Sequence, residues 1–451
     1  RRHGAREADR MSSEFITLFM FASMLLLMAT GQRVFGVIGF VGAAAALWLW
    51  GKGSAEMPFN ASIQVLNWFP LITVPFFVFM GYILSESGIA SNLYRMFHVW
   101  FGGVRGGLAL GTMGLMVLIS CMNGLSVAGM AIGATVALPQ LLARGYDKRM
   151  VTGVIQGGSS LGILLPPSVV LVLYAMIARQ PVLQLWLAGI VPGLMMAALF
   201  TAYIYIRCRI NPALGPALPK EELDAIPRAE KLKLLSAGIL PIGIFAAIMG
   251  LFMTGVTSLV ESSVVGAALA MLAALVTGRL NRRVLEDSTR NTLGVSCMFL
   301  WIILGALCFS SVYDGLGAVR AIEGLLLHTW DLGRWEILIA MMLSFVILGI
   351  FLDDTAMLVI VAPLYIPLVR SLGFDPIWFG VLYTITCQIA YITPPFGYNL
   401  FLMRAMAPPD ISLGDIYRSI WPFFFLMVLS MVIIMIFPQI ALWLPNLYTG
   451  R

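Results

Sequence analysis

The chain has 451 residues, of which 60% are hydrophobic and 11% are charged. Soluble domains carry about 25% charged residues, so this composition excludes a soluble globular protein and indicates an integral membrane protein. The formal net charge is +6. It does not indicate nucleic-acid binding, because the basic residues lie in short connectors, as the positive-inside rule describes for cytoplasmic loops.

Apolar runs of about 20 residues recur along the chain, and each is long enough to cross a bilayer as a helix. In chain order these runs are 14–30, 34–50, 67–83, 107–121, 123–142, 183–206, 237–254, 257–278, 292–312, 334–352, 355–370 and 416–440. They predict an all-α polytopic membrane protein with about a dozen transmembrane helices. Residues 1–10 contain four arginines, and we interpret them as a polar leader or an expression remnant outside the fold.

One sequence pattern occurs twice, and every matching position is displaced by 228 residues. The first copy contains Pro139, Gly145, Tyr146, Asp147 and Pro166-Pro167, and the second contains Pro367, Gly373, Phe374, Asp375 and Pro394-Pro395. This internal duplication predicts two halves, 11–206 and 234–451, joined by the polar linker 207–233, which we expect to be cytoplasmic. Halves that enter the bilayer in opposite senses form inverted repeats, as in many secondary transporters.

Each Pro-Pro pair lies within a long uncharged run. Proline breaks a helix, and a broken membrane helix in each half is typical of a transporter's binding site. We therefore predict re-entrant hairpins around 150–178 and 376–406. Their candidate ligands for an ion or a substrate are Gly158, Ser159, Ser160, Gly162, Pro166, Pro167 and Ser168, and then Thr393, Pro394, Pro395, Gly397 and Asn399. The alternative is that each proline pair is a kink with no ligand.

The broken helices carry groups suited to ions of both signs. Carbonyl groups near 163–165 lose their helical partners because proline donates no hydrogen bond, and a sodium ion could satisfy them. A new helix is expected to begin after Ser168. The free N–H groups at such a helix N-terminus suit a carboxylate or a sulfonate.

A second polar interruption precedes each Pro-Pro pair. In the second half it contains Asp353, Asp354 and Thr355, and a charge at this depth costs at least about 2.5 kcal/mol, which favours a functional role over a helix end in water. Neighbouring residues of one helix point about 100° apart, so we expect only one aspartate to line the site. The first half offers Asn123, Gly124 and Ser126 at corresponding positions. Sodium prefers oxygen ligands, and we predict a Na+ site near Asn123, Ser126, Asp354 and Thr393.

Several catalytic motifs are absent from the sequence. It contains no Gly-x4-Gly-Lys-Ser/Thr phosphate loop and no His-Glu-x-x-His motif, so we expect neither ATP hydrolysis nor enzymatic activity, and no cofactor besides a coupling ion. The five cysteines are scattered and indicate neither a disulfide framework nor a zinc site.

The two hairpin segments resemble the large membrane subunit of tripartite ATP-independent periplasmic (TRAP) transporters. The similarity extends over about residues 14–440, and its most specific parts are 138–174 and the segment that begins GFDPIWFGVLYTITCQIAYITPPFGYN at Gly373. Phe351-Leu352-Asp353 resembles a family pattern at a broken helix. Residues 122–126 depart from the family's frequent Ser-Gly-Ser, so Asn123 and Ser126 are alternative sodium ligands.

This resemblance implies a sodium-coupled importer of an organic anion, working by an elevator mechanism in the inner membrane of a bacterium or an archaeon. It also implies two partners, a small Q-type membrane subunit and a periplasmic substrate-binding protein. One alternative is a stand-alone ion-coupled anion carrier of the same superfamily. Another is a proton-pumping subunit of a respiratory complex, which would need buried lysines, whereas all five lysines here lie in connectors.

Overall fold

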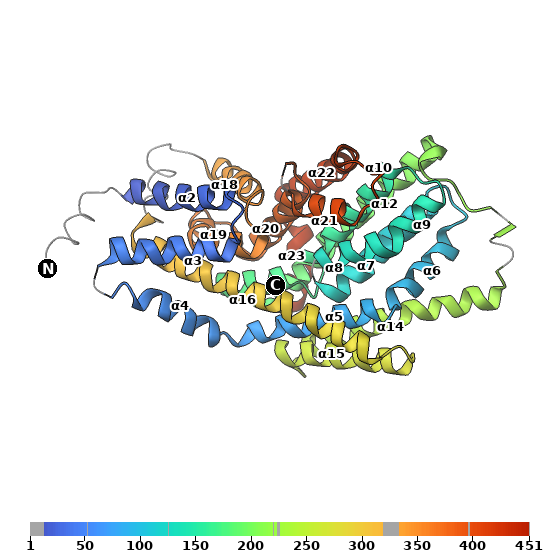
Figure 1. Ribbon diagram of the computed structural model, residues 1–451, viewed down its shortest axis with the longest axis horizontal. Coiled ribbons are helices and arrows are strands. Elements are labelled where there is room, and N and C mark those ends of the chain that lie inside the picture. The colour runs from blue at the N-terminus through green and yellow to red at the C-terminus, as the bar shows by residue number, and fades with distance from the viewer. Residues whose placement is uncertain are drawn as a thin grey trace.

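The computed structural model describes residues 13–51, 53–124, 126–219, 221–222, 226–318, 333–395 and 397–450. Every regular element in these residues is a helix, which confirms the predicted all-α class. The predicted leader 1–10 lies outside the described residues. Figure 1 shows an elongated molecule in which α2, α3 and α18 lie towards one end and α6 and α9 towards the other. In that view α16 runs obliquely along the molecule between these ends.

The first half begins with five α-helices and a broken span, and then forms the first hairpin and a long exit helix. Its elements are α2 (Ser13–Ala29), α3 (Val34–Ala45), the π-helix η1 (Ala46–Trp50), α4 (Glu56–Leu66), η2 (Phe69–Ile72), α5 (Thr73–Glu86), α6 (Ile89–Phe101), α7 (Gly107–Asn123), α8 (Ser126–Ile132), the π-helix η3 (Gly133–Ala137), α9 (Leu138–Ala143), α10 (Lys148–Ser160), η4 (Leu161–Ile163), α11 (Val169–Ala178) and α12 (Val182–Ile210).

The second half repeats this order. Its elements are η5 (Pro212–Leu214) in the connector, then α14 (Arg228–Met253), α15 (Leu259–Val276), α16 (Arg282–Gly315), α18 (Arg334–Leu348), α19 (Asp354–Ser371), α20 (Pro376–Tyr391), α21 (Tyr398–Met406), α22 (Leu413–Ile436) and α23 (Gln439–Thr449). Helices α12 and α14 therefore extend into both ends of the predicted linker 207–233. The connection between α12 and α14 is therefore shorter than the predicted linker.

Among the described residues, five helices are long and apolar enough to span a membrane: 69–86, α12, α15, α16 and α22. A sixth candidate is α19, whose two segments are bent by 57°. Shorter apolar helices of 10–17 residues account for most of the remaining predicted runs. The predicted dozen thus includes many helices that are shorter than a full span, as hairpin arms and broken helices must be.

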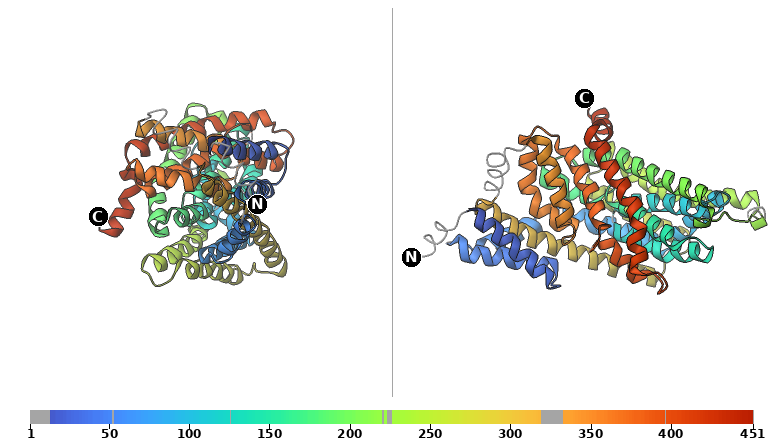
Figure 2. Two further views of the ribbon diagram at one scale, coloured as in Figure 1. Left: turned by 90° about the vertical axis from the view of Figure 1, so that its left-hand side faces the viewer. Right: turned by 90° about the horizontal axis from the view of Figure 1, so that it is seen from above.

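The helix packing follows a two-fold pattern. Contacts occur in pairs that exchange equivalent elements of the two halves: α3–α16 with α15–α5, α10–α22 with α20–α12, and α8–α21 with α19–α11. Such reciprocal contacts are those that a two-fold axis generates between two copies of one unit. Figure 2 shows the same interleaving from two further directions, with second-half helices lying among those of the first half.

The two copies of the hairpin entry begin with the same cap. The Asp147 carboxylate accepts hydrogen bonds from the N–H groups of Arg149 and Met150 at 3.1 and 2.9 Å, and Asp375 accepts from Ile377 and Trp378 at 2.7 and 3.2 Å. An N-cap of this kind stabilises a helix by about 1 kcal/mol. The repeated aspartate therefore sets the start of α10 and of α20.

Candidate binding site at the helix breaks

The first hairpin is broken between η4 and α11, at the first Pro-Pro pair. The Ser168 hydroxyl caps α11 by accepting from Leu171 N at 3.2 Å, and it also donates to the Ile163 carbonyl. The expected helix start after Ser168 is therefore present. The Ile163 carbonyl is one of those that a sodium ion was expected to satisfy, and here the Ser168 hydroxyl satisfies it.

The second hairpin is broken between α20 and α21, at the second Pro-Pro pair. The Thr393 hydroxyl donates to the Ile389 carbonyl at 2.6 Å, which satisfies one of the last carbonyls of α20. The Pro395 carbonyl accepts from the Tyr417 hydroxyl at 2.9 Å. Gly397 is the N-cap of α21 and offers no side chain there, so this helix start is less fully capped than that of α11.

The break between α7 and α8 lies against the tip of the first hairpin. Gly124 has a φ of +62°, a conformation that favours glycine, and a Cβ atom there would lie 2.0 Å from the Pro167 carbonyl oxygen. Only glycine fits this close approach. The predicted grouping of Gly124 with the first Pro-Pro pair is therefore a direct main-chain contact.

A polar cluster joins the two halves beside this contact. The Asn399 Nδ2 atom donates to Ser126 Oγ at 3.1 Å and lies 3.4 Å from Ser159 Oγ, and all three residues are buried. Ser126 comes from the α7–α8 break, Ser159 from the first hairpin and Asn399 from the second. The structure thus brings together predicted site residues from three separate segments.

A second bond connects the hairpins at equivalent positions of the repeat. Gln388 Nε2 donates to the Ser160 carbonyl oxygen at 2.9 Å, and these residues are 228 positions apart, which is the repeat offset. The Gln388 Oε1 atom is buried and has no hydrogen-bond partner among the described residues. Gln388 was missed in the sequence, although a buried carboxamide in an apolar hairpin arm is itself a signal.

The two aspartates lie between α18 and α19. Asp353 is the N-cap of α19 and has an extended main chain, while Asp354 is the first helical residue. The Asp354 Oδ1 atom accepts from Thr355 N at 2.8 Å, and the Tyr383 hydroxyl donates to the Asp354 carbonyl. The Asp353 Oδ1 atom is buried without a partner among the described residues.

A cavity of about 670 Å³ opens at these aspartates. Both Asp353 and Asp354 line it, so the expectation that only one would do so was wrong. The reason is that Asp353 lies before the first turn, where the 100° spacing of helical residues does not apply. Other lining residues come from α3, α16 and the second hairpin, and they include Arg33, Cys297, Tyr391 and Tyr398.

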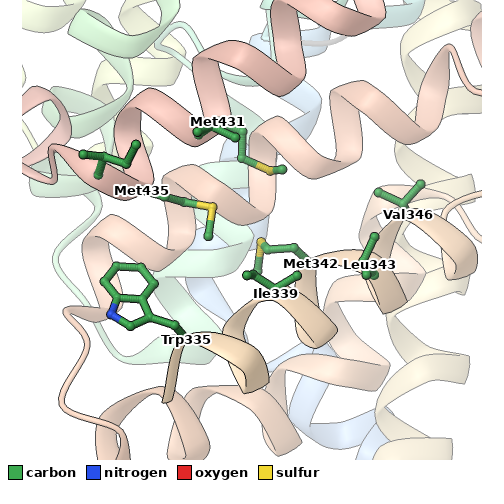
Figure 3. A pocket seen from close by; sticks show the side chains of 9 residues that line it. Trp335, Ile339, Met342, Leu343, Val346, Met431 and Met435 are labelled. Carbon is green, nitrogen blue, oxygen red and sulfur yellow. The ribbon is translucent and has the colours of Figure 1, made fainter. Parts of the chain in front are cut away.

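A second, apolar pocket of about 560 Å³ lies between α18 and α22 (Figure 3). Trp335 and Met342 line it from α18, and Met431 and Met435 line it from α22. Its lining contains no charged residue. Hydrocarbon can fill such a pocket, whereas a carboxylate or sodium ion would lose its hydration there without a polar partner.

The remaining predicted ligands lie in the first hairpin and at the end of α7. Gly158 and Gly162 are buried in α10 and η4, and the Ser160 hydroxyl donates to Gly157 O at 2.7 Å. Asn123 ends α7, and the description does not include its side chain. Among the described residues, no group of three or more histidine, cysteine and acidic side chains could hold a metal ion.

Residues 21–440 match the family described as "Tripartite ATP-independent periplasmic transporter, DctM component". The chain belongs to this family. It is therefore a transporter permease in a bacterial membrane and not an enzyme, as its sequence predicted. The match covers both hairpins, the cavity and the polar cluster.

Two relatives illustrate the family. The chain is 29% identical to the C4-dicarboxylate TRAP transporter large permease protein DctM of Pseudomonas aeruginosa, over 84% of this chain and 86% of that protein. It is 26% identical to the isethionate TRAP transporter permease protein DctMQ of Oleidesulfovibrio alaskensis, over 94% of this chain and 65% of that protein. The name of the second relative combines the M and Q components of a TRAP system.

Two solved transporters have a similar fold. Neisseria gonorrhoeae MtrF aligns with a TM-score of 0.58 at 17% identity, covering 88% of this chain and 85% of MtrF. The Alcanivorax borkumensis YdaH transporter aligns with a TM-score of 0.58 at 16% identity, covering 95% of this chain and 98% of YdaH. The permease therefore has the all-helical polytopic fold of these transporters.

Proposed function

We propose that this permease is the membrane subunit of a sodium-coupled importer for an organic anion, a carboxylate or a sulfonate. The observation that carries the proposal is the cavity beside Asp353 and Asp354, at a helix break that the fold buries. Two adjacent carboxylates repel each other and lose hydration when buried. A bound cation offsets both costs.

Sodium fits the groups that are available around these aspartates. The unpartnered Asp353 Oδ1 atom and the Asp354 carboxylate provide hard oxygen ligands, and hydroxyl groups lie nearby on Tyr391 and Tyr398. The cluster of Ser126, Ser159 and Asn399 is a second, neutral oxygen-rich candidate. Hard cations such as sodium bind to sites of this composition.

The organic anion is inferred from two lines of support. The names of the relatives specify C4-dicarboxylate and isethionate, one a carboxylate class and the other a sulfonate. In addition, the capped N-terminus of α11 at Ser168 directs helix N–H groups toward the hairpin tip. An anion whose charge is balanced by co-transported sodium can cross this region without leaving a net buried charge.

The proposed mechanism is an elevator, in which the two hairpins and their bound ligands move relative to the other helices. The reciprocal packing of α10 with α22 and of α20 with α12 holds the hairpins in one unit. Further proposed components are a small Q-type membrane subunit and a periplasmic binding protein that delivers the anion. The basic segments 207–233 and 279–290 are assigned to the cytoplasmic side of a bacterial or archaeal inner membrane.

The test is uptake into proteoliposomes that contain the permease and the products of its neighbouring genes. Labelled carboxylates and sulfonates are offered under inward gradients of sodium, of protons or of potassium. Uptake that requires both sodium and the binding protein is the expected result. Uptake by the permease alone would favour a stand-alone carrier, and uptake driven only by a proton gradient would contradict sodium coupling.

A further inference from the structure

We propose that Arg33 contacts the anionic group of the transported solute inside the cavity that holds Asp353 and Asp354. This inference rests on the proposed function and adds a specificity-determining residue to it. Arg33 is the one cationic side chain among the described residues that line the cavity. It reaches the cavity from α3, at the far end of the sequence from the aspartates on α19.

The side chain of Arg33 is not committed to a structural role in the described part of the chain. It is exposed, and no described residue forms an ion pair or a side-chain hydrogen bond with it. Arg33 is also the N-cap residue of α3, but its side chain does not cap the helix. The guanidinium group is therefore available to a ligand in the cavity.

The charges of the cavity explain why an anion needs this residue. Asp353 and Asp354 repel a carboxylate or a sulfonate, and sodium bound to them offsets that repulsion without forming a directional bond to the solute. A guanidinium group can form such directional bonds, because its planar N–H groups bind carboxylate and sulfonate oxygens in pairs. The N-terminus of α3 adds positive potential at the same place.

The two charges come from different helices. Arg33 is the N-cap residue of α3, the aspartates lie at the start of α19, and both of these helices pack against α16. A movement of α19 relative to α3 would separate Arg33 from the aspartates. The arginine therefore meets the solute only in the arrangement described here, and would release it after such a movement.

A native thiol provides a direct test. Cys297 is exposed and lines the same cavity from α16, while Cys208, Cys308 and Cys387 are buried. The probes are two thiol reagents of similar size, one carrying a sulfonate (MTSES) and one carrying a quaternary ammonium (MTSET). Labelling of the purified full chain is followed by mass spectrometry, with Cys297→Ser as the background.

The readout is the ratio of the MTSES rate to the MTSET rate. We expect Arg33→Gln to lower this ratio by about fivefold, the effect of removing a unit charge within one Debye length of the thiol. Arg33→Lys keeps the positive charge and should leave the ratio close to the wild-type value. The matched control is Arg282→Gln, an exposed arginine roughly 22 Å along α16 from Cys297, which should leave the ratio unchanged.

The outcomes separate this inference from the proposed function. If Arg33→Gln leaves the MTSES/MTSET rate ratio unchanged, the role of the Arg33 charge is overturned. The same holds if Arg33→Lys lowers the ratio as much as Arg33→Gln does. Labelling requires neither sodium nor uptake, so it remains informative if sodium coupling fails. Where uptake is measured, we expect Arg33→Gln to raise KM about tenfold with Vmax within about a factor of two, since the contact is made on binding; an unchanged KM would contradict contact with the solute.

Discussion

Gln388 donates a hydrogen bond to the carbonyl oxygen of Ser160 at 2.9 Å, and the two residues occupy the same position in the two copies of the repeat. A residue can touch its own equivalent only close to the axis that relates the copies. The two-fold axis that relates the two halves therefore passes between the hairpins. The polar cluster at Asn399 joins the same two hairpins, so the proposed transport chemistry is gathered near this axis.

Replacing Gln388 by leucine should destabilise the permease. The change removes the donor to Ser160 O in a buried position, at an expected cost of about 1–3 kcal/mol in the free energy of unfolding. Thermal unfolding in detergent measures the loss. The matched control is Gln64→Leu, an exposed position on α4, where we expect a change within about 0.5 kcal/mol. Equal stability of the two variants would show that the bond at the axis contributes nothing.

The bond between Asn399 and Ser126 can be isolated by a double-mutant cycle. We expect Asn399→Ala and Ser126→Ala to be coupled by about 0.5–1.5 kcal/mol, because their side chains share one buried hydrogen bond. The cycle is measured by chemical or thermal unfolding of the four proteins. A control cycle pairs Asn399→Ala with Ser62→Ala, a residue on α4 whose hydroxyl bonds to Pro58 O. Strict additivity in the first cycle would contradict the cluster.

Removing the charge of either cavity aspartate should impair coupling. We expect Asp353→Asn and Asp354→Asn each to lower sodium-driven uptake by at least about tenfold, because a neutral amide binds sodium more weakly than a carboxylate. The initial rate is measured in proteoliposomes as a function of sodium concentration. Asp287→Asn, at an exposed ion pair with Arg283 on α16, serves as the control and should retain uptake. Wild-type sodium dependence in both cavity variants would remove the aspartates from the mechanism.

The connector is held to the first half by a pH-dependent ion pair. Arg144 forms two bonds of 2.6 Å with the Glu222 carboxylate, and this arginine lowers the pKa of Glu222. A carboxylate with a lowered folded-state pKa stabilises the fold above its unfolded pKa, and this contribution is lost as the pH falls through the folded value. Both side chains are partly exposed, so the contribution should stay below about 1 kcal/mol.

The check is the difference in melting temperature between the wild type and Glu222→Gln. This difference should be present at pH 7 and should shrink toward about pH 4 and below, as the wild-type carboxylate takes up its proton. Because the pair is partly exposed, high salt should also reduce it. A difference that does not change with pH would show that the charge of Glu222 does not stabilise the connector.

Much of this architecture can be predicted from the sequence. The offset between the two Pro-Pro pairs predicts two hairpins, and the polar interruptions at Ser126 and Asp354 predict two further breaks. These features can be predicted from the sequence because a proline within a helix and a charge within the membrane each have a large free-energy cost at their own position. The helical class follows from composition alone.

Other features depend on tertiary contacts that no local pattern encodes. The pairing of Gln388 with Ser160 requires the axis to pass between the hairpins, and Arg33 reaches the cavity from a helix more than three hundred residues before the aspartates. Whether one or both of Asp353 and Asp354 line the cavity depends on the residue at which α19 begins. The sequence does not fix that start to within one residue.

The most direct test of the proposed sodium site is the thermal stability of the purified permease in sodium chloride against equal concentrations of choline chloride. Sodium that binds only the folded protein should raise its stability by about 1.4 kcal/mol at ten times the dissociation constant. We predict this increase for the wild type and its absence from the Asp353→Asn/Asp354→Asn double variant. Equal stabilisation of both proteins by sodium, or none in the wild type, would contradict a sodium site at these aspartates.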